Sequence, residues 1–318
     1  MYLSEAYCVK LLRACQYNHC SYPIDIFTDA LDHSFIPILF FFDIPHPFRT
    51  KCIKARELFQ EIFVSVMEAR QQKAKDDPTY QPPRDFLQDL MEATYRDGSK
   101  PTPQEITGIL IGVLLGGQHT SNVTGTWILV HLLKNKEWMD KVMAEQDELF
   151  EAKKEPLLSP STLTFEEVQK MTVFEQVFME VLRLHHPFFQ LSRAVKEDSV
   201  FNGMVIPKGH YVNVAPSAAM RMPDLFEDGS TFDPSRFSPE RTKEMKPYTF
   251  IGFGGGLHQC SGRKFAWNSI KASLSWLLRN YDLELIGKGA TEMPKEDYTT
   301  MVVAPTTEHV QVRYRRRK

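Results

Sequence analysis

The chain has 318 residues, 42% of them hydrophobic and 25% charged, which is the composition of a globular protein long enough to bury a large core. Its formal net charge of −2 gives no overall positive field, so no nucleic-acid partner is expected. Five irregularly spaced cysteines argue against a disulfide framework and, without a C-x-x-C pair, against a structural zinc site. The basic tail from Arg313 to Lys318 is interpreted as a solvated, frayed chain end.

The most apolar run of the sequence, SFIPILFFFDIP, centres on residues 35–42. About eight apolar residues are too few for a membrane-spanning helix, which needs about twenty. We interpret the run as a core segment, with a surface that dips into a bilayer as the alternative. No signal peptide or anchor is expected at the N-terminus, and residues 1–24 receive no assignment.

Helical periodicity dominates the first 190 residues. Apolar residues recur every three or four positions from Arg49 to about Lys73, which predicts a helix. Three prolines in residues 77–84 predict a loop. The capping box TPQE predicts a long helix from Thr102 to about Leu133. A further helix is predicted from Phe165 to His186, because the proline that follows favours a stop there.

The long helix contains an anomaly, because it is rich in glycine and each glycine is about 1 kcal/mol less favourable than alanine in a helix interior. The polar run GQHTS at residues 117–121 also interrupts an otherwise apolar element. Both observations suggest that something packs closely against this helix, or that it is locally distorted. The glycines are Gly108, Gly112, Gly116, Gly117 and Gly125.

The last third of the chain changes character. β-Branched residues alternate with turn residues between Ala194 and Val214, which predicts short hairpins. Residues 216–256 show little periodicity, and so long an irregular stretch needs either a function or heavy cross-bracing. A final helix is predicted from about Ser261 to Tyr281, with short strands after it.

The most specific signal is the run FGGGLHQCSG at residues 253–262. Three glycines allow the backbone to run flat against a large planar ligand. Cys260 stands just before the predicted helix, where the helix dipole and free backbone N–H groups favour a thiolate. Taken alone, the run could also be a tight turn with a buried thiol.

Together with Gly262, three of these residues, Phe253, Gly256 and Cys260, fit the pattern F-x-x-G-x-x-x-C-x-G, which resembles the haem-binding loop of cytochromes P-450. Two further matches stand in the right order. One is E-x-x-R at residues 180–183, and the other is FDPSRF at residues 232–237.

The E-x-x-R spacing places Glu180 and Arg183 on one helix face, and an ordinary surface ion pair is the plain interpretation of such a pair. The resemblance implies instead that Arg236 joins them in a buried structural triad. Such a triad would brace the irregular stretch, since breaking a buried charge network typically costs several kcal/mol.

GQHTS at residues 117–121 is typical of one branch of that family, the sterol 14α-demethylases. LHHP after the E-x-x-R helix and a histidine two residues before Cys260 point to the same branch. The resemblance implies a mostly α fold with small β-sheets, as in a cytochrome P-450 that lacks its N-terminal portion. It also implies a single, partial domain over residues 1–318.

The resemblance assigns roles residue by residue. Cys260 is the axial ligand of the haem iron, in a loop with Phe253 and Gly256, and it promotes O–O cleavage. Thr120 would hydrogen-bond dioxygen, and His119 would relay protons towards it. The remaining assignments concern the haem propionates and the substrate. His258 and Arg193 would neutralise the propionates, and the substrate pocket would include Gly116, Gly117, Phe188, Phe189 and Leu191.

The function implied is that of a haem-thiolate monooxygenase, the oxidative removal of a sterol 14α-methyl group. The cofactor would be haem b, with electrons from NADPH supplied through NADPH–cytochrome P-450 reductase, and the other partners would be the sterol and O2. Family resemblance also implies the cytosolic face of the endoplasmic reticulum membrane, although no anchor is expected in this chain. The alternatives are a cytochrome P-450 acting on another lipophilic substrate, and an inactive, haem-free fragment with an interaction role.

Overall fold

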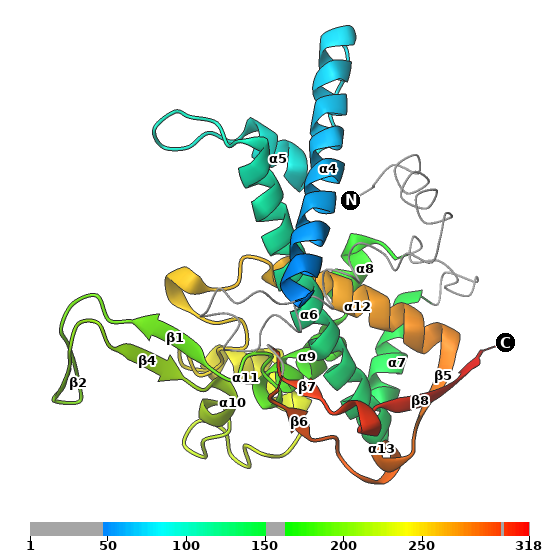
Figure 1. Cartoon of the computed structure of the whole chain (residues 1–318). Helices are drawn as coiled ribbons and strands as arrows, with labels where there is room; N and C mark the ends of the chain where they lie inside the picture. Colours follow the sequence, from blue (N-terminus) through cyan, green and yellow to red (C-terminus); the bar gives the residue numbers. More distant parts are fainter. Residues whose placement is uncertain (1–46, 151–162, 300–301, 318) are drawn as a thin grey trace. The chain divides into compact units, whose positions relative to one another are not determined.

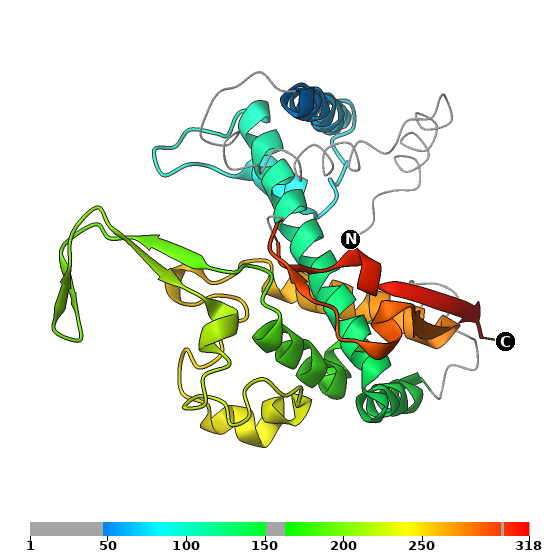
Figure 2. The same ribbon diagram turned by 60° about the horizontal axis from the view of Figure 1, so that its bottom comes forward.

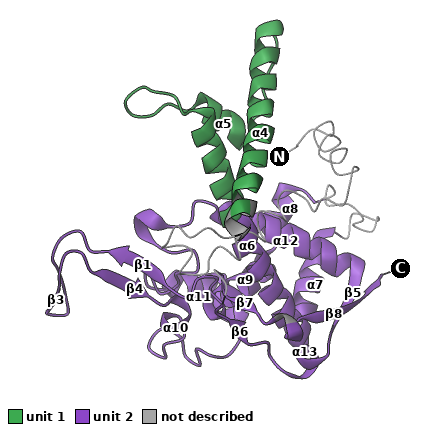
Figure 3. Ribbon diagram, in the orientation of Figure 1, with its two compact units in different colours: residues 1–116 green, residues 117–318 purple. Residues whose placement is uncertain are grey.

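The computed structural model describes residues 47–150, 163–299 and 302–317 (Figure 1). The chain divides into two compact units, unit 1 over residues 1–116 and unit 2 over residues 117–318 (Figure 3). The single domain expected over residues 1–318 stays a prediction. The apolar run at residues 35–42 and the unassigned residues 1–24 lie outside the described part of the chain.

Unit 1 is helical in its described part, with α4 Pro47–Asp76, α5 Phe86–Glu92 and the first turns of α6 Pro103–Lys134. The predicted capping box starts α6. The Thr102 amide donates to Glu105 Oε2 at 2.7 Å, and the Glu105 amide donates to Thr102 Oγ1 at 3.3 Å. Apolar side chains of α4 pack against α6, for example Phe59 beside Ile111. The two longest predicted helices of the N-terminal half are therefore present within about three residues of their expected bounds.

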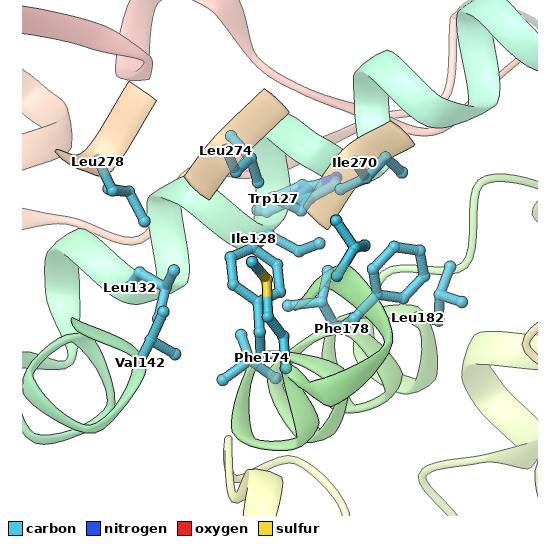
Figure 4. Close-up of a cluster of buried hydrophobic side chains, with 14 of the residues drawn as sticks. Trp127, Ile128, Leu132, Val142, Phe174, Phe178, Leu182, Ile270, Leu274 and Leu278 are labelled. Carbon is cyan, nitrogen blue, oxygen red and sulfur yellow. The ribbon is translucent and has the colours of Figure 1, made fainter. Parts of the chain in front are cut away.

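Unit 2 is built around a core formed by four helices (Figure 4). The last turns of α6 contribute Trp127 and Ile128, and α12 Arg263–Asn280 contributes Ile270 and Leu274. The other two helices are α7 Lys136–Phe150 and α9 Thr172–Leu184.

The prediction of one helix from Phe165 to His186 is wrong in one respect. The structure has two helices there, α8 Phe165–Lys170 and α9. The break falls at Met171, whose ψ of 77° is not helical and whose side chain is fully buried. Apolar spacing continues through this buried residue, so the hydrophobic pattern does not show the break.

Four two-stranded antiparallel sheets complete the described part of unit 2. β1 Leu191–Ala194 pairs with β4 Tyr211–Val214, and β2 Ser199–Phe201 pairs with β3 Met204–Ile206, so the hairpins predicted there are confirmed. The remaining pairs are β5 Tyr281–Ile286 with β8 Gln311–Arg316, and β6 Glu296–Asp297 with β7 Ala304–Pro305.

The prediction that the basic tail is a frayed chain end is wrong, because most of the tail forms strand β8. Arg315 pairs with Asp282 of β5 at 3.1 Å, and Arg313 pairs with Glu284 of β5 at 3.1 Å. Alternating arginines thus face carboxylates across the sheet, and this cross-strand complementarity stabilises the pairing.

The irregular stretch contains only short helical pieces, as expected from its lack of periodicity. They are α10 Pro216–Ala219, a 3₁₀ turn at Pro234–Phe237, α11 Pro239–Glu244 and a 3₁₀ turn at Gly256–His258. Two more, α13 Lys288–Thr291 and a 3₁₀ turn at Thr307–His309, lie near the C-terminus.

Within the residues that the structure describes, no helix combines the length and the apolar character that crossing a membrane requires.

Candidate active site

The loop before α12 is folded back on itself by its own backbone. The Cys260 amide donates to the Phe253 carbonyl oxygen at 2.9 Å, and the Gly254 amide donates to the Ile251 carbonyl at 2.9 Å. Gly254 and Gly256 have φ angles of 72° and 63°, in the left-handed region that glycine enters without strain. This local geometry explains why glycine stands at these two positions. It also places Cys260 just before the N-terminus of α12.

The Cys260 thiol is exposed at the end of this loop. A Cβ atom added to Gly262 would lie 3.8 Å from Cys260 Sγ, so glycine at that position leaves the sulfur uncovered. Gly262 is also the N-cap residue of α12, and the free N–H groups of the first helical turn follow it. The alternative of a buried thiol in a tight turn is therefore wrong. An accessible sulfur donor on a compact, glycine-rich loop fits a haem thiolate site.

Aromatic stacking holds the loop on the core. The Phe253 ring lies 5.4 Å from the Trp267 ring of α12 and 6.1 Å from the Phe178 ring of α9. The Arg263 guanidinium lies over both Phe253 and Trp267, at 5.7 Å and 4.7 Å from the ring centroids. Such cation–π contacts are typically worth about 0.5–1 kcal/mol at exposed sites. Phe253 thus anchors the loop to α9 and α12.

The GQHTS segment lies inside α6, which runs without interruption from Pro103 to Lys134. A Cβ atom added to any of its five glycines would meet nothing within 4 Å beyond the local helix backbone. Within the described residues no break interrupts this helix, and no other part of the chain packs on its glycines. The expectation that something packs closely there stays a prediction. The open space beside Gly117 is compatible with a bound ligand. The Thr120 carbonyl accepts a hydrogen bond of 2.7 Å from Thr124 Oγ1.

Glu180 and Arg183 form a two-fold ion pair on α9, with both Nε–Oε2 and Nη2–Oε1 distances at 2.7 Å. Both side chains are fully buried. Arg236 Nε lies 3.6 Å from Glu180 Oε1, and the Asp233 amide donates to the same oxygen at 2.8 Å. The pair is thus no surface ion pair, and both carboxylate oxygens of Glu180 have partners.

Arg183 carries this bracing into the irregular stretch. Its Nη1 donates to the Met220 carbonyl at 2.8 Å, and its Nη2 donates to the Thr231 carbonyl at 3.1 Å. Arg236 Nη2 donates to the Asp228 carbonyl at 3.2 Å. Backbone groups of a segment without regular structure are thereby satisfied by buried guanidinium groups, which answers the need for cross-bracing.

Of the expected propionate residues, His258 lies in the cysteine loop itself and Arg193 lies on β1, while three of the expected substrate residues lie between the end of α9 and the start of β1. Arg193 lies on β1 with its side chain exposed, and its Nη1 donates to the carbonyl of the preceding residue at 2.8 Å. His258 is exposed in the loop before Cys260. Phe188 and Phe189 are exposed and Leu191 is half-buried, between the end of α9 and β1.

A cluster of buried polar side chains was not found by the sequence analysis. His131 Nε2 and His185 Nε2 lie 2.9 Å apart, and His185 Nδ1 lies 2.9 Å from Glu296 Oε1. The Trp127 ring stacks on His185 with centroids 3.7 Å apart. Arg221 and Tyr298 also contact the Glu296 carboxylate, at 3.3 Å and 2.6 Å. The only part of this cluster that the sequence analysis noted was His185, within LHHP after the E-x-x-R helix. Nothing in the sequence indicated its contacts with His131 and Glu296.

Burial sets the charges in this cluster. Desolvation, and then the nearby His185, lower the pKa of His131 from 6.5 to about 3. Desolvation also lowers the pKa of His185, although Glu296 opposes the shift. Burial acts to raise the pKa of Glu296, but hydrogen bonds from His185 and Tyr298 outweigh it and lower the pKa to about 2. The cluster therefore holds neutral imidazoles beside an ionised carboxylate.

A surface pocket of about 410 Å³ opens onto this cluster. Its lining is mostly polar and charged, and consists of His185, Arg221, Pro294, Lys295, Glu296 and Tyr298. Such a lining differs from the apolar surface that a sterol requires.

Comparison with known proteins adds to this geometry. The family model described as Cytochrome P450 matches residues 20–312. The sterol 14-demethylase of Arabidopsis thaliana is 38% identical over 296 residues, which are 91% of this chain and 57% of that protein. The lanosterol 14-alpha demethylase of Cunninghamella elegans is 32% identical, over 89% of this chain and 57% of that protein. That of Rattus norvegicus is 33% identical, over 86% and 51%.

Among solved structures, the retinoic acid-bound cyanobacterial CYP120A1 superposes with a TM-score of 0.75 at 27% sequence identity. The match covers 92% of this chain and 63% of that one. The expected fold class, mostly α with small sheets, is confirmed by this likeness and by the elements described above. The chain spans a little over half the length of the curated relatives named here.

Proposed function

This chain belongs to the cytochrome P450 family, and from that premise we propose that it carries the haem-thiolate site of a monooxygenase. The reaction is the oxidative removal of a sterol 14α-methyl group, using O2 and electrons from NADPH delivered by a reductase. The observation that carries the proposal is the exposed Cys260 thiol at the end of its glycine-rich loop. The sterol 14-demethylases among the relatives support the choice of substrate.

Bound haem b would supply the iron at which dioxygen is activated. Cys260 would hold it through sulfur, and Phe253 and Gly256 would keep the loop in place beneath it. His258 and Arg193 would face the propionates as charge partners. Cys260, His258 and Arg193 are exposed, Phe253 anchors the loop on the core, and Gly256 gives the loop its left-handed turn.

Residues of α6 would handle the proton and the substrate. The Thr120 hydroxyl would hydrogen-bond dioxygen, and His119 would move a proton towards it. Gly116 and Gly117 would leave room beside the helix. Phe188, Phe189 and Leu191 would present apolar surface to the sterol, and the first two are already exposed. The triad of Glu180, Arg183 and Arg236 would act by holding the loop region in shape.

The proposed partners follow from the same site. The reductase would dock on the face near Cys260, where Arg263 and Lys264 are exposed and could meet an acidic surface. The location would be the cytosolic face of the endoplasmic reticulum membrane, as for sterol demethylases of eukaryotes.

A second candidate is a cytochrome P450 acting on another lipophilic substrate. The retinoic acid bound to CYP120A1 favours it, since that ligand is lipophilic but no sterol. Product analysis with sterols, fatty acids and retinoids separates the two candidates. A third possibility, an inactive haem-free fragment with an interaction role, predicts a stable chain that retains no haem.

The deciding experiment is the carbon monoxide difference spectrum of the haem-loaded, dithionite-reduced chain. We expect the long-wavelength Soret band of a thiolate ligand, and its loss in Cys260→Ala. Ser261→Ala, at the neighbouring exposed position, serves as the matched control and should keep the band. A spectrum without that band, or one unchanged in Cys260→Ala, would contradict the proposal. An azole-induced spectral shift in the same sample then tests the sterol demethylase assignment.

A further inference from the structure

The polar pocket of unit 2 lies where three segments of the chain meet. His185 ends α9, Arg221 follows α10, and Lys295, Glu296 and Tyr298 stand in or beside β6. The three segments can be followed in Figures 1 and 2. The pocket volume of about 410 Å³ falls within the range of about 300–1,000 Å³ that is typical of small-molecule sites.

Arg221 keeps hydrogen-bond donors available at this pocket. Its Nη2 group donates to the Leu184 carbonyl oxygen at 2.6 Å and to Glu296 Oε1 at 3.3 Å. Among the described residues, none accepts from its Nε or Nη1 group, and 30% of the side chain surface is exposed. A guanidinium that is held at one corner and open at the others can receive the oxygen atoms of a ligand.

Lys295 brings a second cation to the pocket. Its carbonyl oxygen accepts from the Thr306 amide at 2.9 Å, so its backbone is tied to the residue that follows β7. The side chain is exposed, and within the described ranges of the chain its ammonium group forms no ion pair. The charge of Lys295 is therefore available to a ligand.

The carboxylate of this lining is already engaged. Glu296 accepts from His185 Nδ1 at 2.9 Å, from the Tyr298 hydroxyl at 2.6 Å and from Arg221 at 3.3 Å. Because burial keeps the His185 ring neutral, the lining holds two cations, Arg221 and Lys295, against one carboxylate. The net positive charge favours an anionic ligand.

We propose that this pocket binds a small organic anion, with its carboxylate or phosphate group on Arg221 and Lys295 and its apolar part against Pro294 and the Tyr298 ring. A guanidinium recognises both anionic groups through paired N–H donors, and an ammonium adds a point charge. The Tyr298 side chain offers 58% of its surface for the apolar contact. The bound anion links β6, which in the described part of the chain pairs only with β7, to the end of α9. This binding requires neither haem nor the monooxygenase reaction.

The test is acetylation of the 318-residue chain by an activated ester, with the labelling rate of Lys295 measured by mass spectrometry of its peptide. Benzoate and phenyl phosphate are the two probes, and sodium chloride keeps the ionic strength equal in all samples. We expect one or both probes to slow the labelling of Lys295 at least about threefold, as mass action gives for a ligand at twice its Kd. The probe with the stronger effect identifies the preferred anionic group.

Two controls belong to this experiment. Benzamide is the neutral counterpart of benzoate and should leave the labelling rate of Lys295 unchanged. Lys243 on α11 is exposed and does not line the pocket, so its labelling rate should stay the same in every sample. If neither anion protects Lys295, or if benzamide and the anions protect it equally, the proposal is overturned.

Variants then test the two cations separately. Arg221→Gln should raise the concentration of anion that protects Lys295 by about tenfold, because a charge-assisted hydrogen bond is lost. Arg221 also holds the Leu184 carbonyl, so Lys295→Gln provides a second measurement that leaves this contact in place. The anion should raise the Tm of the wild type and of Lys243→Gln, whereas Lys295→Gln should lose most of the rise. A rise that Lys295→Gln keeps in full would contradict binding at this pocket.

Discussion

The Nε2 atoms of His131 and His185 lie 2.9 Å apart in the interior of unit 2, so only one of the two rings can donate the hydrogen bond between them. His185 turns its other nitrogen towards the Glu296 carboxylate, at 2.9 Å, and donates there. While both rings are neutral, His131 is therefore the donor to His185. An added proton would place a cation among Trp127, Arg221 and Phe232, where both imidazole rings are largely buried.

The stability of the chain should fall as the pH drops below about 6.5. The folded His131 has a pKa of about 3, whereas its usual value is 6.5, so below 6.5 the unfolded chain binds the proton and the folded one does not. At about 1.36 kcal/mol per pH unit, roughly 2 kcal/mol is lost by about pH 5. Urea denaturation at several pH values measures this loss. His131→Gln should make the dependence shallower, with the part due to His185 remaining, and His210→Gln, at an exposed position, should leave it as in the wild type. Equal slopes in all three chains would refute the assignment.

Arg183→Met should destabilise the chain by about 3–5 kcal/mol, because it leaves the buried Glu180 carboxylate without its main partner. The loss is read from urea denaturation or from Tm. Arg241→Met is the control, since the Arg241 side chain is half exposed and its contact with Asp233 is 3.5 Å long. That change should cost under about 1 kcal/mol. If the single variant does not fold, the double variant Glu180→Gln/Arg183→Met should recover part of the stability. No recovery would mean that charge burial is not the cause.

Gly254→Ala should disturb the cysteine loop more than its backbone strain alone requires. A left-handed conformation costs a non-glycine residue about 1–2 kcal/mol, and the new Cβ would also lie 3.3 Å from the His258 carbonyl oxygen. Gly98→Ala is matched in its positive φ of 86° but meets nothing within 4 Å. Gly254→Ala should lose more stability in urea than Gly98→Ala, and only Gly254→Ala should retain less haem after gel filtration. Equal haem retention would show that the loop tolerates the side chain.

His258→Ala and Arg193→Ala should each speed the release of haem about tenfold, if the two side chains pair with its propionates as proposed, since a charge-assisted hydrogen bond contributes about 1.5–3 kcal/mol. Haem transfer to an excess of an acceptor globin measures the rate. Arg313→Ala, an exposed arginine on β8, is the control and should leave the rate unchanged. If all three variants release haem at the wild-type rate, neither His258 nor Arg193 pairs with the propionates.

Local rules predicted the local parts of the structure well. The capping box at Thr102 placed the start of α6 within one residue, and the stripe of Ile270 and Leu274 on α12 packs in the core as its spacing indicates. These signals lie within a few residues of what they determine. The Asn202–Gly203 turn likewise sets the register of its own hairpin.

The contacts that the sequence did not show join residues far apart in the chain. His131 and His185 are 54 positions apart, and His185 and Glu296 are 111 apart, with no spacing rule to connect them. The Glu180–Arg236 contact was expected only through family resemblance. The break at Met171 was missed for the opposite reason, because a buried methionine continues the apolar stripe on both sides of it.

The Glu180 carboxylate also bears on the order in which the chain assembles. It accepts from the Asp233 amide across 53 positions, while Arg183 on the same helix holds carbonyls up to 48 positions away. The buried guanidinium and carboxylate contacts that brace the irregular stretch therefore form only once α9 has formed, and they are lost whenever α9 opens. The two segments should behave as one cooperative foldon, with amides of 216–250 exchanging their hydrogens no more slowly than the opening of α9 allows.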